Sequence, residues 1–209
     1  MNVSAHWGEA AAGLGRLAGV DEAGRGSLAG PVVAAAVMLP RDAVLPGLAD
    51  SKQLGPGTRR RLADAIRVEA IAYAVAAVEA GEIDATNILR ATFRAMAEAV
   101  RGLIPQPDLV LVDGNMLPPL PVPAQWVIRG VQLVPAISAA SILAKVTRDA
   151  LMDDWAVRYP AYGFERHKGY GTADHRARIA RFGPCAIHRK SFAGVREHLG
   201  EAAAQGSLW

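Results

Sequence analysis

Four carboxylates stand where the chain could hold a metal ion. Asp21 and Glu22 are adjacent and follow an apolar segment, Asp113 comes directly after another apolar segment, and Asp149 follows a run of small and apolar residues. Carboxylate oxygens without cysteine partners select hard cations such as Mg²⁺ or Mn²⁺, and pairs of such ions serve in-line phosphoryl displacement. For any single acid a surface carboxylate or a helix cap is the simpler interpretation, and spacing alone leaves both interpretations open.

A glycine-rich turn follows the two adjacent acids. Alternation along a strand would send Asp21 and Glu22 to opposite faces, so both reach one site only if the strand ends or bulges there. The stretch 24–29 also matches the dinucleotide-binding pattern G-x-G-x-x-G/A. Pro31 and the β-branched residues after it do not predict the helix that such a site needs, and the acids would repel a pyrophosphate. We therefore expect the turn to approach a substrate phosphate, with Arg25 as a donor.

Basic charge is concentrated in one part of the chain. Residues 129–190 hold 11 Lys and Arg against 5 Asp and Glu, whereas residues 1–128 hold 11 against 13. The basic segment also carries aromatic residues, among them Trp155, Tyr159, Tyr162, Phe164 and Tyr170. Basic and aromatic side chains together suit a nucleic-acid backbone and its sugar or base faces. A solvated basic surface above an aromatic core is an equally good interpretation of the same composition.

Length and composition indicate one soluble domain. The chain has 209 residues, of which 51% are hydrophobic, so it can bury a sizeable core. Its longest apolar runs, such as 31–40, are too short to span a bilayer, and no secretory signal is apparent at the N-terminus. Cys185 is the single cysteine, which excludes an internal disulfide and a cysteine-rich zinc site. We expect a cytoplasmic protein in which Cys185 is a small packed side chain.

The elements that must position these residues alternate between strands and helices. Apolar runs predict strands at 16–20, 31–39, 70–78, 108–112 and 126–129. Helical spacing predicts helices at 56–69, 85–102 (capped by Asp84), 138–158, 173–182 and 192–204. This order favours a mixed sheet with helices on its faces. Asp21, Glu22 and Asp113 then lie at strand ends, where α/β sheets gather ligands and catalytic groups.

Six segments in order resemble the ribonuclease HII family of type 2 ribonucleases H. They are GVDEAGRG with AGPVV at 19–33, DSKQL at 50–54, VDGN at 112–115, ISAASILAKVTRD at 137–149, GFERHKGYGTADH at 163–175 and HRKSF at 188–192. Together they cover nearly the whole chain. The resemblance implies a single ribonuclease H-like catalytic domain over 1–209 with its core at about 16–192. It also implies an α/β fold with a five-stranded mixed sheet, flanking helices and further C-terminal helices.

The resemblance also assigns roles to individual residues. Asp21, Glu22 and Asp113 match the family's metal-binding carboxylates, and Asp149 matches its fourth active-site acid. The residues that match the family's substrate-binding positions are Gly24, Arg25, Gly26 and Tyr170. The ion implied is Mn²⁺ or Mg²⁺.

One departure from the family pattern follows the last predicted strand, at 126–129. The family usually reads Lys-Gly-Asp where this chain has Arg129-Gly130-Val131. We expect the change to remove an acid at the edge of the site and to leave the four carboxylates in place. The motif histidines His167, His175 and His188 are expected to be structural.

The implied activity is hydrolysis of RNA in RNA–DNA hybrids, including cleavage 5′ to a single ribonucleotide in duplex DNA. Such an enzyme must read the 2′-hydroxyl that DNA lacks. The expected partners are hybrid duplexes or DNA that contains ribonucleotides, with no membrane and a monomeric protein. The alternatives from other classes are a nicotinamide-dependent oxidoreductase and a noncatalytic nucleic-acid-binding module.

Overall fold

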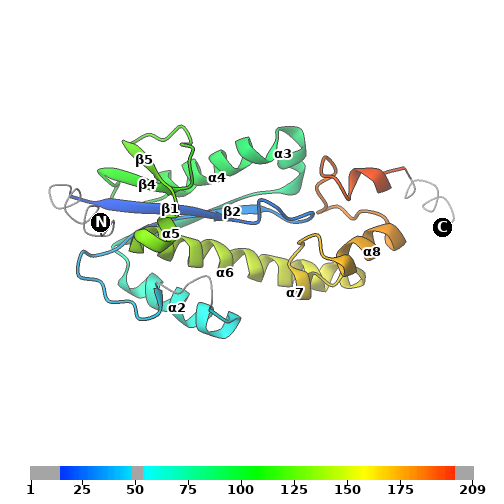
Figure 1. Cartoon of the computed structure of the whole chain (residues 1–209), viewed down its shortest axis with the longest axis horizontal. Coiled ribbons are helices and arrows are strands. Elements are labelled where there is room, and N and C mark those ends of the chain that lie inside the picture. The colour runs from blue at the N-terminus through cyan, green and yellow to red at the C-terminus, as the bar shows by residue number, and fades with distance from the viewer. Residues whose placement is uncertain (1–14, 49–53, 201–209) are drawn as a thin grey trace.

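The computed structural model describes residues 15–48 and 54–200, and its centre is a mixed sheet of five strands (Figure 1). The strand order is β3-β2-β1-β4-β5. The strands are β1 (Leu17–Ala23), β2 (Val32–Met38), β3 (Ala72–Val78), β4 (Leu109–Asp113) and β5 (Ala124–Val127). β1 pairs antiparallel with β2, as β2 does with β3, whereas β1 pairs parallel with β4, as β4 does with β5. The predicted five-stranded mixed sheet is confirmed.

Alternation along β2 divides the core into two layers. Val32, Ala34, Ala36 and Met38 belong to one apolar cluster, and Ala35 and Val37 belong to another. The first cluster packs under α4 (Ile88–Arg101) and the second under α2 (Pro56–Glu69) and α6 (Pro135–Arg158). Figure 1 shows these helices on opposite faces of the sheet. A strand whose seven residues are all buried is expected when both faces are covered.

The long helix α6 approaches β1 closely because the facing residues are small. A Cβ added at Gly19 would fall 2.2 Å from the backbone of Ala136 and Ile137, so the strand needs a glycine at this crossing. The buried residues Ala139 and Ala140 of α6 continue the contact with the sheet. This crossing fixes which residues of α6 reach the end of β1, where the acids lie.

The C-terminal part lies beyond the end of β1, beside the far half of α6 (Figure 1). Its elements are η2 (Pro160–Tyr162), α7 (Phe164–His167), α8 (Ala173–Phe182) and η3 (Arg196–His198). It is tied to the loop after β1 by isolated bridges from Ser27 to Tyr170 and from Ala29 to His188. Thus the glycine loop is held between the sheet and the C-terminal helices.

Some predicted boundaries are wrong. The helix expected at 85–102 is α4, which begins at Ile88, and a separate short helix, α3 (Ala80–Ala85), precedes it. The cap of α4 is Asn87 instead of Asp84, and the Asn87 side chain accepts a hydrogen bond from the Arg90 N–H. Asp84 lies inside α3 and instead accepts from the backbone N–H groups of Lys190 and Ser191. Of the helix expected at 192–204, the described part holds only η3, and residues 201–204 lie outside the described ranges.

Two further observations bear on the alternatives. The chain from Gly24 to β2 contains turns and bridges and no helix, so the dinucleotide-binding pattern lacks the helix it requires. Within the described residues, no helix is long and apolar enough to cross a membrane.

A short α5 (Gly130–Leu133) joins β5 to α6.

Candidate active site

Three carboxylates meet where two parallel strands end. The pairing of β1 with β4 stops at Val20 and Val112, yet β1 continues through Asp21 and Glu22. Asp113 is the last residue of β4. The predicted end or bulge of β1 is therefore wrong, because it is the neighbouring strand that stops. The space left beside β1 explains how adjacent residues of one strand can both interact with Asp113.

Asp21 is the most buried of the three, with 7% of its surface exposed. Its carboxylate accepts the backbone N–H of Glu22 at 2.8 Å and a hydrogen bond from the side chain of Ser141 on α6. Burial, and then the charges of Glu22 and Asp113, raise its pKa to about 8. Clustered carboxylates in a poorly solvated site disfavour their own ionised form, which a bound cation would reverse.

Glu22 faces both the acids and a basic side chain. Burial raises its pKa and so does Asp113, whereas Arg25 acts in the opposite direction. The Arg25 Nη1 atom lies 3.4 Å from Glu22 Oε1, and the Arg25 side chain is half exposed. Such a partly exposed pair contributes little stability. It leaves Glu22 able to turn toward a cation and Arg25 able to turn toward a phosphate.

Asp113 has an unexpected neighbour. Its Oδ1 atom accepts the backbone N–H of Val131 at 3.3 Å, and Val131 itself is 4% exposed. A Cβ added at Gly130 would also fall 3.1 Å from the same oxygen. The backbone at position 131 thus contacts a candidate metal ligand, while the Val131 side chain packs in an apolar cluster with Leu111, Val127 and Ile137.

Asp149 lies apart from this group. It is eight residues beyond Ser141 on α6, which corresponds to about 12 Å along the helix axis. Its Oδ1 atom accepts from Lys145 Nζ at 2.7 Å. The structure thus brings Asp21, Glu22 and Asp113 together. Asp149 is paired with Lys145, which lines the same pocket as Glu22.

The oxygen-only donor set of the three acids fits a hard divalent ion. Within residues 15–48 and 54–200, no three His, Cys, Asp or Glu side chains already form a metal cage. Glu22 also pairs with Arg25, and a bound ion would compete with this contact. The three carboxylates fit such an ion in chemistry.

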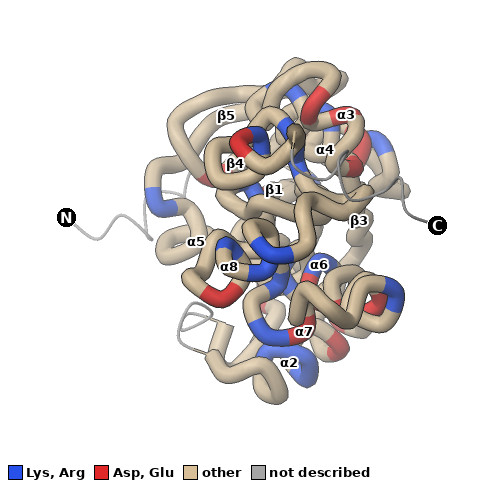
Figure 2. Tube along the Cα trace, turned by 90° about the vertical axis from the view of Figure 1, so that its right-hand side faces the viewer, with Lys and Arg blue, Asp and Glu red and all other residues tan. Residues whose placement is uncertain are grey.

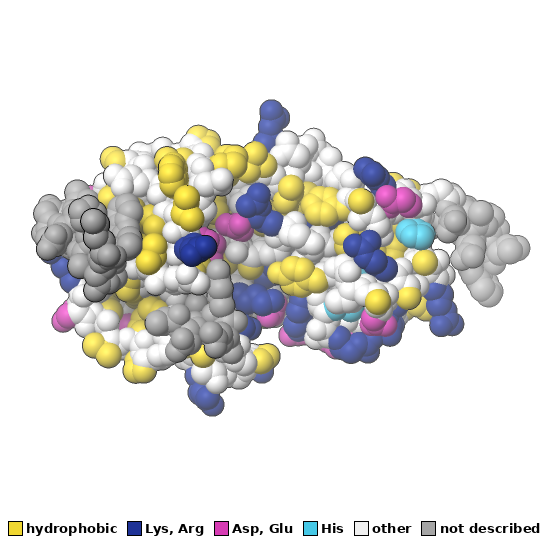
Figure 3. All heavy atoms as spheres, viewed as in Figure 1, with side chains coloured by type: hydrophobic (Ala, Val, Ile, Leu, Met, Phe, Trp, Pro, Cys, Tyr) yellow, Lys and Arg dark blue, Asp and Glu magenta, His cyan; other side chains and the backbone are white. Residues whose placement is uncertain are grey.

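A pocket of about 480 Å³ opens from the carboxylates toward the C-terminal part. Glu22, Gly24, Arg25, Lys145 and Tyr170 are among the residues that line it. Acidic side chains at the middle of the visible face are flanked by basic ones in Figure 3. Of the four predicted acids Glu22 alone lines this pocket, together with the basic residues Arg25, Arg59 and Lys145.

Tyr170 borders this pocket on the loop between α7 and α8. It is 37% exposed, and Lys145 Nζ and the Arg148 guanidinium each lie 5.4 Å from the centre of its ring. The loop is fixed to the glycine turn, because the Leu28 N–H donates to the Gly169 carbonyl at 2.8 Å. Tyr170 is therefore a partly exposed aromatic beside the acids and is not a core residue.

Four other aromatics of the basic segment are packed away from the pocket. Trp155, Tyr159, Tyr162 and Phe164 belong to one apolar cluster with Met152. For these four the interpretation as a core is confirmed. The basic residues of the segment gather around α6, α7 and α8 at the end of the molecule that faces the viewer in Figure 2.

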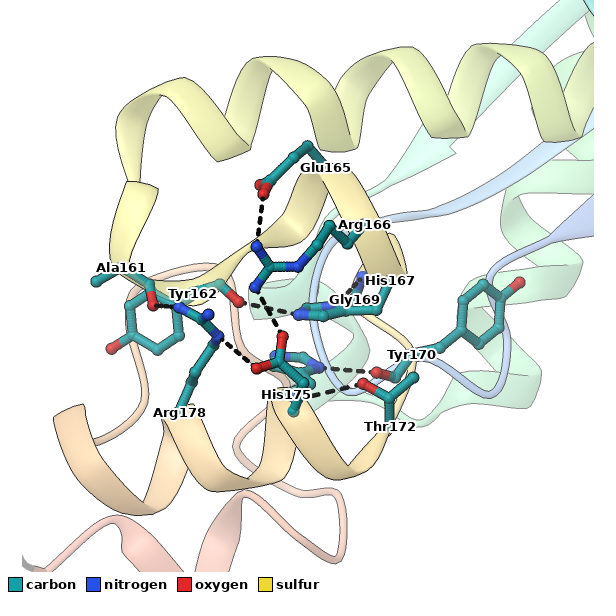
Figure 4. A network of polar contacts seen from close by, with 11 residues as sticks. Ala161, Tyr162, Glu165, Arg166, His167, Gly169, Tyr170, Thr172, His175 and Arg178 are labelled. Atoms are coloured by element: carbon teal, nitrogen blue, oxygen red, sulfur yellow. Dashed lines mark hydrogen bonds and ion pairs between the residues drawn. The ribbon is translucent and has the colours of Figure 1, made fainter. Parts of the chain in front are cut away.

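The three motif histidines are buried together under the Tyr170 loop, and Figure 4 shows two of them, His167 and His175. The rings of His167 and His175 are stacked at 4.3 Å, and the Nε2 atoms of His175 and His188 lie 3.0 Å apart. His188 Nδ1 accepts the Cys185 N–H, so its Nε2 carries the proton shared with His175. The other His175 nitrogen then donates to the Tyr170 carbonyl. Their structural role is confirmed by this arrangement.

Cys185 shares this environment. It is half-buried, and burial raises the pKa of its thiol to about 11. A thiol that stays protonated at neutral pH is a poor nucleophile, in agreement with the expectation of a packed side chain.

Sequence reasoning missed three basic residues near the site. Lys145 lines the pocket, and Arg148 and Arg189 are fully buried behind the glycine loop. All three lie in segments that resemble the family, but their charge alone predicted a surface position. The segment 50–53, which includes Asp50, Ser51 and Lys52, lies outside the described residues.

Comparisons with known proteins agree with this geometry. A family model described as Ribonuclease HII matches residues 18–195. The chain is 53% identical over 187 residues to Ribonuclease HII of Geotalea uraniireducens (strain Rf4), covering 90% of this chain and 87% of that protein. It is 56% identical over 185 residues to Ribonuclease HII of Verminephrobacter eiseniae (strain EF01-2), covering 88% of each.

Solved structures give the same fold. The ribonuclease H2 from Pyrococcus horikoshii OT3 superposes with a TM-score of 0.76 at 26% identity, covering 90% of this chain and 99% of that one. Bst-RNase HIII in complex with Mn²⁺ superposes with a TM-score of 0.69 at 19% identity, covering 94% and 73%.

Proposed function

The chain belongs to the ribonuclease HII family, and we propose that its three clustered acids and its glycine loop form the active site of this activity. The enzyme is an endonuclease that hydrolyses the RNA strand of RNA–DNA hybrids and cuts at ribonucleotides embedded in DNA. We infer that it nicks 5′ to a single ribonucleotide and leaves 3′-hydroxyl and 5′-phosphate ends. The observation that carries the site is the meeting of Asp21, Glu22 and Asp113 where β4 stops beside β1.

Asp21, Glu22 and Asp113 would hold the divalent ion, Mn²⁺ or Mg²⁺. When bound, such an ion lowers the pKa of a water and stabilises the leaving 3′ oxygen. The chain's own contribution is to keep the three carboxylates close and poorly solvated. Ser141 and the Glu22 N–H fix the orientation of Asp21 through hydrogen bonds.

Arg25 and Lys145 would neutralise substrate phosphates in the pocket beside the acids. Both line the pocket, and Arg25 is half exposed. We assign Asp149 to the site as its fourth acid in a positioning role, because its carboxylate holds the Lys145 ammonium at 2.7 Å. A duplex bound by several such cations should dissociate as salt concentration rises.

The ribonucleotide would be recognised by the loop of Gly24, Arg25 and Gly26 together with Tyr170. Side chains are absent from the two glycines, so backbone groups can come close to a 2′-hydroxyl. The exposed part of the Tyr170 ring would pack on the adjoining nucleotide. A site that pairs with a hydroxyl rejects the analogue that lacks it.

The proposed partners are hybrid duplexes and ribonucleotide-containing DNA, bound by a monomeric cytoplasmic protein. The experiment is to incubate the protein with a duplex that carries one ribonucleotide, with and without Mn²⁺ or Mg²⁺. We expect a nick only with metal. Binding without a nick under any metal condition would support the noncatalytic binding module, and binding of a nicotinamide cofactor without a nick would support the oxidoreductase.

A further inference from the structure

Two arginines are fully buried without a carboxylate partner. Arg148 on α6 and Arg189 after α8 are each 0% exposed. In the part of the chain that the structure describes, neither guanidinium has an acidic oxygen within ion-pair distance. Burial, and then the charge of nearby Arg148, lower the pKa of Arg189 to about 9. Burying two cations in this way is costly, so their placement calls for a reason other than stability.

The two guanidiniums donate hydrogen bonds to backbone carbonyls in and around the glycine loop. Arg189 donates from Nη2 to the Gly24 carbonyl at 2.7 Å, from Nη1 to the Arg25 carbonyl at 2.8 Å and from Nε to the Gly30 carbonyl at 3.0 Å. Arg148 donates to three further carbonyls, those of Ala29 (3.0 Å), Pro31 (2.9 Å) and Lys168 (2.9 Å). Six carbonyls on two segments are thus turned toward the buried pair.

The orientation of these carbonyls determines which way the loop's donors point. In a trans peptide the N–H points opposite to the C=O. Because the Gly24 and Arg25 carbonyls face Arg189, the N–H groups of Arg25 and Gly26 face away from it. Arg25 and Gly26 are both exposed. Among the described residues neither N–H donates to a protein acceptor. Two aligned donors are therefore presented at the outer surface of the loop.

Arg148 also connects the loop with the aromatic side of the pocket. It binds the Lys168 carbonyl, two residues before Tyr170, and lies 5.4 Å from the centre of the Tyr170 ring. A Cβ at Gly24, where φ is +93°, would fall 1.9 Å from Arg148 Nε. Gly24 is therefore required by the arginine behind it as well as by its own backbone conformation.

We propose that Arg148 and Arg189 are positioning residues that turn the Arg25 and Gly26 N–H groups toward a ribonucleotide and its phosphate. Their positive charge, buried behind the loop, also favours an anion on the outer side of the loop. This inference rests on the proposed function and names the residues that give the loop its specificity. Lysine at either position would keep the charge but lose the planar fork that reaches three carbonyls at once.

The test compares Arg189→Lys and Arg148→Lys with Leu103→Ala. Leu103 is fully buried on the opposite face of the sheet, so its variant loses stability without touching the loop. Each change is made with Asp113→Asn, so that duplexes stay intact. Kd is measured for a duplex with one ribonucleotide and for the same duplex in DNA. We expect the ratio of the Kd for the DNA duplex to the Kd for the ribonucleotide duplex to fall about tenfold or more in both lysine variants. It should be unchanged in Leu103→Ala at a comparable loss of Tm.

A second measurement covers the case in which the lysine variants do not fold. In the Asp113→Asn protein, amide hydrogen exchange at Arg25 and Gly26 should slow when the ribonucleotide duplex binds and should slow less with the DNA duplex. No slowing at these amides, or an unchanged Kd ratio in a folded lysine variant, would overturn the proposal. The nicking assay on the otherwise unmodified protein is separate, so a failure of the activity is distinguished from a failure of this inference.

Discussion

The acid cluster at the end of β1 and the arginine–histidine region behind the glycine loop satisfy their polar groups in opposite ways. At the acid cluster, burial and mutual repulsion raise the pKa of Asp21 and Glu22, and a partly exposed Arg25 is the cation beside them. Behind the loop, Arg189 donates to three backbone carbonyls, and His188 accepts a backbone N–H. In the first region the carboxylates need a cation from outside to balance their charge. In the second region the side chains form their hydrogen bonds with the protein itself and hold the loop in its conformation. Chemistry and recognition are thereby assigned to separate parts of the molecule.

The largest effect is expected at the acid cluster. Asp113→Asn should lower the cleavage rate by several orders of magnitude while leaving folding and hybrid binding intact, because an amide is a poor ligand in place of a carboxylate. Cleavage rates at saturating Mn²⁺, duplex Kd and Tm would be measured together. Near-normal turnover at saturating Mn²⁺ would remove Asp113 from the site.

The next effect concerns recognition. Tyr170→Ala should slow cutting at a single ribonucleotide roughly tenfold or more, since a stacking contact contributes about 1–3 kcal/mol. Tyr170→Phe keeps the ring and is the matched control. Initial rates on a single-ribonucleotide duplex and on a long hybrid would be compared with melting curves. An equal loss on both substrates together with a lower Tm would make Tyr170 a packing residue, and the two regions would no longer divide recognition from chemistry.

A change at Val131 tests whether one more negative charge near the acid cluster strengthens metal binding. Val131→Asp adds a carboxylate beside Asp113 and should tighten metal binding about tenfold, as expected for one more charge near a divalent ion in a partly solvated site. Calorimetric titration of the free protein with Mn²⁺ gives the Kd directly. Val131→Asn, which has the same shape without the charge, should leave the Kd nearly unchanged. Equal Kd values for all three proteins would mean that position 131 does not face the ion.

The smallest effect is a pH dependence of the arginine–histidine region. Burial lowers the pKa of His175 to about 4 and of His188 to about 3, so both stay neutral in the folded protein where the unfolded chain already binds protons. The stability they confer is therefore present above about pH 6.5 and is lost as pH falls toward 4. Tm should drop by several degrees over this range.

His188→Gln is the variant that isolates this dependence. Its Tm should be lower at pH 7 but should fall less on acidification than the Tm of the unmodified protein, because one of the two coupled groups no longer titrates. Tm curves that run parallel for the two proteins from pH 7 to 4.5 would show that the stack does not cause the acid sensitivity.

Much of the site followed from local pattern, and the rest depended on packing. The strand that ends at Asp113 and the glycine turn after Glu22 are features of a few consecutive residues, so the sequence predicted them. The distance of Asp149 from the other acids depends on how α6 crosses β1, which is set by the contact of Gly19 with Ala136. No periodicity along the helix reveals that register.

The buried arginines show a second limit. Arg189 is a charged residue in a short basic motif, for which exposure is the ordinary expectation. Its burial depends on carbonyls of the glycine loop more than 150 positions earlier in the chain. Likewise Asp84, which was expected to cap a helix, instead accepts a hydrogen bond from the Ser191 N–H, 107 positions later in the chain. Long-range hydrogen bonds of this kind leave no mark in local spacing.

The most direct test of the division between chemistry and recognition varies one group of the substrate. Four duplexes would differ only at one nucleotide, which is ribo, deoxy, 2′-fluoro or 2′-O-methyl, and cutting would be followed with Mn²⁺ and with Mg²⁺. The account predicts a nick on the 5′ side of the ribonucleotide, with the other three duplexes intact because they lack the hydroxyl that donates and accepts. Comparable cutting of the all-DNA duplex would contradict it.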